Sequence, residues 1–116
     1  MATSSEFIEL IIELLEGHGQ VSVRRMFGGH GIFRDGLMFG IIDDDVLYLK
    51  ADAETRVVYT KRGLEPFTYL RSNKPASLSY YRAPAECLED SAEMMAWADP
   101  AYAAALRSAG QKRKQG

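Results

Sequence analysis

The stretch Gly28-Gly29-His30-Gly31 comes nearest to a chemical site in this sequence. Glycines let backbone amides approach an anion closely, and a histidine can act as a general base near neutral pH. One hypothesis is therefore a pocket around Arg25, His30 and Tyr48 that binds an anionic small molecule or catalyses a reaction on it.

The surroundings of these glycines favour a structural role. A phosphate loop ends in Gly-Lys-Ser or Gly-Lys-Thr and leads into a helix, and a dinucleotide-binding fingerprint needs a strand-to-helix crossover. In this chain the strand-like run Ile32-Phe33-Arg34 follows instead. We interpret the glycines as a bulge or bend in a curved sheet, because glycine inside a strand pattern marks such a place.

Other residues with catalytic or metal-binding potential lack the spacing that such chemistry needs. The chain has two histidines and one cysteine, without a Cys-x-x-Cys or His-Glu-x-x-His pair, so we expect no metal site. Cys87 has the acidic neighbours Glu86 and Glu89, which would raise its pKa and favour a packed rather than a reactive thiol. Asp43-Asp44-Asp45 lacks the pattern of a calcium loop and indicates a polar turn. We predict no catalytic residue, no cofactor and no bound metal.

Length and composition indicate a single globular domain. The chain has 116 residues, of which 47% are hydrophobic and 26% charged, with a formal net charge of -2. This charge gives no overall attraction to nucleic acid or to an anionic membrane. The N-terminus has neither a signal peptide pattern nor a membrane span, and the single cysteine does not call for an oxidising compartment. We expect a cytoplasmic protein.

The hydrophobic pattern predicts secondary structure of both kinds. An amphipathic helix is expected over 6–16, because its glutamates fall on the face opposite to its hydrophobic residues. Residues 21–50 predict a three-stranded meander, with a type I′ turn at Asp35-Gly36 and a looser turn at Asp43-Asp44-Asp45.

The second half of the chain predicts a short helix, two strands and a last helix. Asp52 begins the short helix and Gly63 ends it, and strands follow over 67–71 and 78–82. The last helix starts near Asp90 and is kinked or restarted at Asp99-Pro100. The predicted fold class is α+β, a two-layer domain over 1–108 with a mainly antiparallel sheet. Its elements follow in the order helix, three strands, helix, two strands, helix. A flexible basic tail follows over 109–116.

Several segments resemble one known family. The chain is similar to the N-terminal domain of the TfoX/Sxy family at Arg25-Met26-Phe27-Gly28-Gly29-His30-Gly31-Ile32-Phe33, Asp35-Gly36-Leu37-Met38-Phe39-Gly40, Leu47-Tyr48-Leu49-Lys50-Ala51-Asp52, Pro66-Phe67-Thr68-Tyr69, Tyr80-Tyr81-Arg82-Ala83-Pro84 and Trp97. The resemblance implies a fold akin to secretion-chaperone-like and YgaC-like domains. It also implies a standalone domain with a role in the regulation of natural competence, where founding members act as transcriptional co-activators rather than enzymes.

Two groups of residues follow as candidates from the motif and the resemblance. The structural motif comprises Met26, Phe27, Gly28, Gly29, Gly31, Asp35, Gly36, Tyr48 and Lys50. Contacts to a partner or an anion are expected from Arg24, Arg25, His30 and Arg34.

The first hypothesis is therefore a non-enzymatic regulatory module that binds a protein partner, such as a part of the transcription machinery, or a second copy of itself. Weak direct DNA binding through Lys61, Arg62, Lys74 and the tail is a further alternative. We do not expect nucleic acid as the main partner, because the helices must bury most strand aromatics as core.

Overall fold

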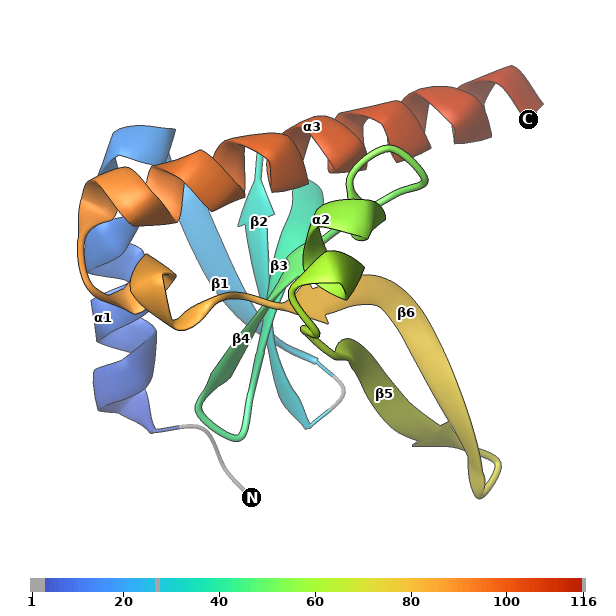
Figure 1. Cartoon of the computed structure of the whole chain (residues 1–116), viewed down its shortest axis with the longest axis horizontal. Coiled ribbons are helices and arrows are strands. Elements are labelled where there is room, and N and C mark those ends of the chain that lie inside the picture. The colour runs from blue at the N-terminus through green and yellow to red at the C-terminus, as the bar shows by residue number, and fades with distance from the viewer. Residues whose placement is uncertain (1–3, 27, 116) are drawn as a thin grey trace.

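The computed structural model describes residues 4–26 and 28–115, apart from the side chains of 70–71, 75–77 and 111–115. Phe27 of the structural motif and the side chains of 111–115 in the basic tail lie outside the described residues. Three α-helices, two short 3-10 helices and six strands follow one another as α1 (Ser5–Leu14), η1 (Glu16–His18), β1 (Val21–Met26), β2 (Gly29–Arg34), β3 (Leu37–Asp43), β4 (Val46–Lys50), α2 (Arg56–Lys61), β5 (Pro66–Arg71), β6 (Lys74–Arg82), η2 (Ala85–Leu88) and α3 (Ser91–Gln115) (Figure 1).

All six strands belong to one antiparallel sheet in the order β1-β2-β3-β4-β6-β5. The predicted α+β class is confirmed. The predicted count of three strands before the second helix is wrong, because Met26 pairs with Gly29 and the chain reverses at Gly28, whose φ is +77°. The glycine-rich stretch thus forms a hairpin of its own at an edge of the sheet.

Tight turns with positive φ join the other hairpins. Asp35 and Gly36 have φ values of 50° and 79°, as the predicted type I′ turn requires. Asp44 and Asp45 have φ values of 50° and 57° between the paired residues Asp43 and Val46, so this turn is tighter than the sequence predicts. These turns fix the register of the central strands.

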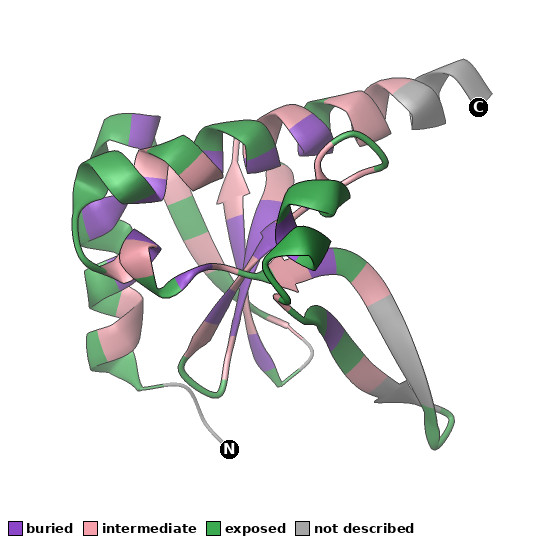
Figure 2. Ribbon diagram, in the orientation of Figure 1, coloured by how far each residue is buried: buried purple, intermediate pink, exposed green. Residues whose placement is uncertain are grey.

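One face of the sheet is covered by all three α-helices. The main hydrophobic core joins residues of α1, α2 and α3 to buried residues of β2, β3 and β4, among them Ile11, Tyr59, Met94, Ile42 and Leu49. Figure 2 shows the buried positions concentrated where the helices lie against the strands. Core formation therefore uses one face of the sheet and leaves the opposite face without a helix among the described residues.

The last helix runs without interruption across Pro100, so the predicted restart is wrong. A proline inside a helix removes the hydrogen bond to the carbonyl four residues earlier, here that of Ala96. Ala96 and Pro100 are both exposed, so water can solvate this carbonyl. The helical backbone then continues to Gln115 in place of an irregular tail and projects beyond the sheet (Figure 1). The domain boundary at 108 stays a prediction.

Candidate functional site

Strand alternation shows which side chains point away from the helices. Successive strand residues face opposite sides of a sheet. Ile42 and Leu49 belong to the core beneath the helices, whereas Ile41 and Tyr48 belong to a second hydrophobic cluster. That second cluster is formed by strand residues alone, so it marks the side of the sheet without helices.

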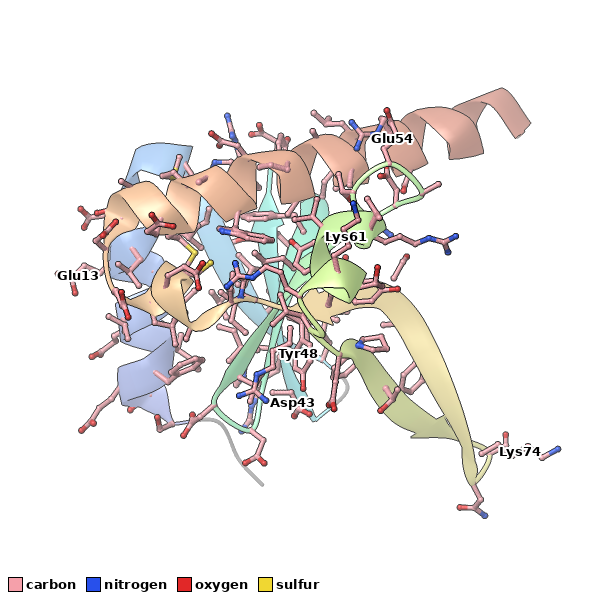
Figure 3. All side chains as sticks on the ribbon, viewed as in Figure 1. Glu13, Asp43, Tyr48, Glu54, Lys61 and Lys74 are labelled. Atoms are coloured by element: carbon pink, nitrogen blue, oxygen red, sulfur yellow. The ribbon has the colours of Figure 1, made fainter. Side chains whose placement is uncertain are left out.

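We call this side the open face. It is formed by the second cluster and by the strand residues on the same side of the sheet: Arg24, Met26, Phe33, Met38, Ile41, Tyr48, Lys50, Phe67, Tyr69, Leu78, Tyr80 and Arg82. In Figure 3, Tyr48 lies on the strands away from α3, with Asp43 close by on the same part of the sheet. All six strands contribute side chains to this surface, and β2 adds the small residue Gly31 beside Phe33.

One row of paired residues crosses the open face from β1 to β6. Arg24 pairs with Gly31, Gly31 with Ile41, Ile41 with Tyr48, and Tyr48 with Arg82. Four steps between neighbouring strands separate the two arginines, or about 19 Å along the sheet at the usual spacing of ~4.8 Å. An exposed cation therefore stands at each end of a largely hydrophobic row.

Gly31 leaves room at the centre of this row for neighbouring side chains. A Cβ at this position would lie 2.5 Å from Met26 Sδ, 2.8 Å from Met38 Sδ and 2.9 Å from Phe33 Cε1. The two thioethers and the phenyl ring thus converge over the glycine backbone. All three residues are half-buried, so they form an adaptable hydrophobic surface that solvent still reaches.

Aromatic rings make up the other half of the open face. The rings of Tyr48 and Phe67 lie 5.1 Å apart edge to face, and Phe67 stacks on Tyr69 at 6.2 Å. The hydroxyl of Tyr80 donates to the Met38 carbonyl at 3.1 Å. Burial raises the pKa of Tyr80, and it also raises that of Tyr48 against the opposing effect of Arg82. These phenols stay neutral and act in packing rather than as bases.

The open face leads to a shallow cavity beside α3. This cavity of about 280 Å³ is lined by Leu37, Met38, Lys50, Tyr80, Ala105, Ser108 and Ala109. Lys50 Nζ donates to Ser79 Oγ at 3.0 Å and lies 5.2 Å from the centre of the Tyr80 ring. The cavity is therefore closed on one side by a lysine that already has partners.

The structure divides the arginines and histidine expected at a contact site between two faces. Arg24 lies on the open face with its guanidinium 4.1 Å from the centre of the Phe33 ring. Arg25 pairs with His30, which pairs with the helix-facing Ile42. Arg34 also lies on the helix side, 4.7 Å from the centre of the Tyr102 ring.

This division bears directly on the pocket hypothesis. Tyr48 faces away from the helices, on the opposite side of the sheet from Arg25 and His30. The three side chains do not converge on one pocket. His30 Nδ1 is buried without a hydrogen-bond partner among the described residues, but no second titratable group completes a catalytic pair with it there.

The remaining motif residues have roles that the backbone explains. A Cβ on Gly29 would lie 2.5 Å from the Ile42 carbonyl oxygen, so only glycine fits between β2 and β3 there. Gly28, Asp35 and Gly36 occupy positive φ. Sequence reasoning did not single out Met38, Ile41 and Arg82 as members of one surface, although alternation along the strands was the available signal.

The arrangement of the described residues favours neither a metal site nor a reactive thiol. Within the residues that the structure describes, no three His, Cys, Asp or Glu side chains gather into a group that could hold a metal. Cys87 is fully buried, and burial, aided by Glu86 and Glu93, raises the pKa of its thiol to about 12. No helix in the described part of the chain is both long enough and hydrophobic enough to cross a bilayer.

The fold and this surface define a small α+β domain with helices on one side of an antiparallel sheet and a hydrophobic open face on the other. The family model for the TfoX N-terminal domain matches residues 13–105, and the chain belongs to this family. The predicted family is thus confirmed.

Two curated relatives give the same assignment. The DNA transformation protein TfoX of Haemophilus influenzae is 36% identical over 85 residues, which cover 72% of this chain and 39% of that protein. The DNA transformation protein TfoX1 of Aliivibrio fischeri is 27% identical over 77 residues, which cover 66% of this chain and 37% of that protein. The match spans about two fifths of the length of these relatives.

Proposed function

We propose that the chain is a non-enzymatic regulatory module that binds a protein partner through the open face. The observation that carries the proposal is the solvent-accessible rim of the second hydrophobic cluster. Ile41, Phe67 and Tyr80 are buried inside this cluster, and no helix among the described residues covers it. Half-buried methionine and tyrosine side chains surround it. Surfaces of this kind mark interaction sites, because a docking partner removes them from water.

The names of the two relatives support a proposal for the process in which the module acts. Both relatives are named as DNA transformation proteins, which supports a role in regulating competence for DNA uptake. We propose that the chain acts in the cytoplasm as a co-activator of transcription and that its partner belongs to the transcription machinery. The absence of converging catalytic side chains among Arg25, His30 and Tyr48 agrees with a binding role.

Deletion and complementation in a host that carries the chain test this function. We expect deletion to lower the transcripts of a restricted set of genes, and the chain supplied at native level to restore them. Affinity capture of the tagged chain under the same conditions should recover the same protein repeatedly. Unchanged transcripts together with an altered metabolite pool would contradict the proposal and favour an enzyme. Self-association alone, measured by analytical ultracentrifugation, would identify a second copy as the partner.

A further inference from the structure

The geometry of the open face points to the chemistry of its partner. We propose that this face binds an amphipathic helical segment of another protein, with a hydrophobic stripe and acidic residues at both ends. The inference rests on the proposed function and adds the kind of segment that is recognised. Helices dock on such surfaces by laying one hydrophobic stripe into a hydrophobic groove.

The centre of the open face supplies the hydrophobic contact. Met26, Met38 and Phe33 converge over Gly31, and the buried Ile41 continues the same surface towards Tyr48. Methionine is unbranched and polarisable, so it adapts to aliphatic and aromatic side chains of different shapes. This part of the face fits leucine-like side chains on one side of a helix.

The two ends of the central row supply the charge. Arg24 and Arg82 are exposed, and neither forms an ion pair within the part of the chain that the structure describes. Carboxylates at both ends of a docked segment would meet these cations. Asp43 pairs with Val46, so its carboxylate lies in the row next to the central one. The central row itself is basic at both ends.

The same aromatic side chains argue against single-stranded nucleic acid as the occupant. Bases bind such sheets by stacking on free ring faces. Here Arg24 covers Phe33, Phe67 stacks on Tyr69, and Lys50 lies over Tyr80.

The spacing of the two arginines sets the length of the segment. A helix rises ~1.5 Å per residue, so the ~19 Å between the ends of the row correspond to about 13 residues. A suitable probe is a synthetic helix of about 14 residues with leucines at i, i+3, i+4, i+7 and i+11 and glutamates in its first and last turns.

Methionine methyl NMR tests the proposal with controls inside the same chain. Met26 and Met38 lie on the open face, whereas Met94 is fully buried beneath the helices. In protein labelled at the methionine methyl groups, the probe should shift Met26 and Met38 and leave Met94 in place. A scrambled peptide of the same composition, a version with lysines for glutamates, and a twelve-nucleotide oligothymidylate should each bind at least about tenfold more weakly.

Charge-reversal variants then test whether the two arginines bind the acidic ends of the probe. Arg24→Glu with Arg82→Glu should weaken the probe at least about tenfold, whereas Arg56→Glu, an exposed site on α2, should leave its affinity unchanged. Unchanged Met94 signals would show that the variants keep the fold. The proposal is overturned if the probe leaves Met26 and Met38 unmoved, if the scrambled peptide binds equally, or if the oligonucleotide binds more tightly. Such a result would leave the proposed function standing wherever affinity capture still recovers a protein.

Discussion

His18 Nδ1 lies 2.9 Å from Asp99 Oδ1 and links η1 to the middle of α3. The side chain of His18 is 2% exposed, and its ring contacts the rings of Phe39 and Tyr102. Its Nε2 is buried without a partner among the described residues. Burial, and next Arg34, lower the pKa of His18 against the opposing effect of Asp99. The folded protein therefore favours the neutral imidazole.

Stability should consequently depend on pH near neutrality. The unfolded chain binds the His18 proton more readily, because the ordinary pKa of 6.5 is lowered on folding. The free energy of unfolding should be highest above pH 6.5 and fall as the pH decreases through that value. Urea unfolding between pH 5 and 7.5 measures this, and His18→Gln should flatten the curve. Asp99→Asn removes the group that opposes the lowering, so it should steepen the loss; a shallower curve in that variant would contradict the account.

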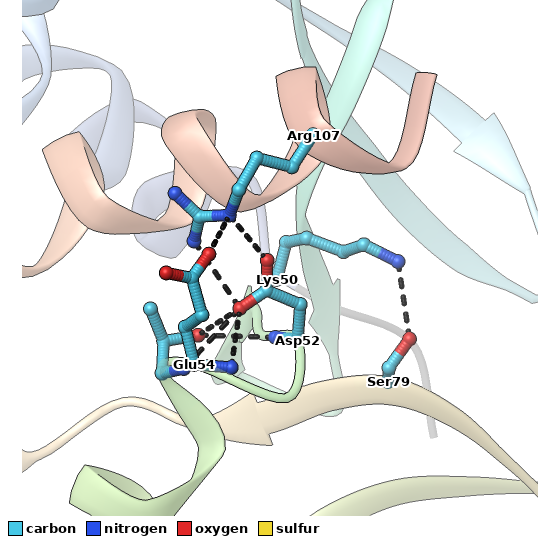
Figure 4. Close-up of polar contacts among 6 residues, drawn as sticks. Lys50, Asp52, Glu54, Ser79 and Arg107 are labelled. Carbon is cyan, nitrogen blue, oxygen red and sulfur yellow. Dashed lines mark hydrogen bonds and ion pairs between the residues drawn. The ribbon is translucent and has the colours of Figure 1, made fainter. Parts of the chain in front are cut away.

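A second pH-dependent contact involves Asp52 and Arg107 (Figure 4). Arg107 Nε lies 2.6 Å from Asp52 Oδ2 and 2.7 Å from Glu54 Oε2, which ties α3 to the loop before α2. The hydrogen bond from Arg107 lowers the pKa of Asp52 from 3.8 to about 2. This contribution is present above pH 3.8 and is lost as the pH falls towards 2.

Removing the guanidinium should therefore destabilise the fold. We expect Arg107→Ala to lower the free energy of unfolding by about 1–2 kcal/mol at pH 7, after discounting the shift for solvent screening. Urea unfolding at pH 7 and pH 3 should show the difference between wild type and variant shrinking at the lower pH. The exposed pair Arg62 and Glu86, whose closest atoms lie 2.7 Å apart, is the control, and Glu86→Gln should cost less. Equal losses at both pH values would rule out the ionic contribution.

The glycines of the first hairpin should respond unequally to alanine. Gly29→Ala forces a Cβ to within 2.5 Å of the Ile42 carbonyl oxygen and should cost about 1–3 kcal/mol. Gly28→Ala has open space but a φ of +77°, so it should cost about 1–2 kcal/mol. Gly110→Ala meets nothing within 4 Å in α3 and should stabilise by about 0.5–1 kcal/mol. Urea unfolding of the three variants measures these differences in the free energy of unfolding. An unchanged free energy of unfolding in Gly29→Ala would contradict the close contact between the strands.

Cys87 should be unreactive in the folded protein. Raising the thiol pKa from 9.0 to about 12 lowers the thiolate fraction at pH 8 about a thousandfold, and the side chain has no solvent access. Reaction with an aromatic disulfide reagent should be slow in buffer and rapid in denaturing urea. Rapid labelling without denaturant would contradict the burial of Cys87.

The sequence predicted the elements well where local chemistry determines them. The alternation of hydrophobic and acidic residues predicted the first helix, and Asp35-Gly36 predicted the turn between β2 and β3. Both signals lie within a few residues of the chain. The reversal at Gly28 was missed, because a glycine run fits both a bend within one strand and a turn between two. The continuity of α3 across Pro100 depends on the exposure of Ala96, which packing decides.

Less of the candidate site than of the fold could be predicted from the sequence. Arg25, His30 and Tyr48 are separated between the two faces by strand pairing, and one residue of register decides this division. The contacts of His18 with Asp99 and of Asp52 with Arg107 join residues far apart in the chain, so no local sequence pattern predicts them. The open face emerges only when the register places Arg24 and Arg82 in one row with Ile41.

Site-specific photo-crosslinking in cells tests most directly whether the open face meets the partner. Phe33 lies half-buried on the open face, and a benzoyl-substituted phenylalanine replaces it with another aromatic side chain. Val58, 48% exposed on α2, is the matched position on the helix side. We expect a protein crosslink from position 33 and none from position 58. A protein crosslink from position 58 alone, or a nucleic-acid adduct from position 33, would contradict the assignment of the open face.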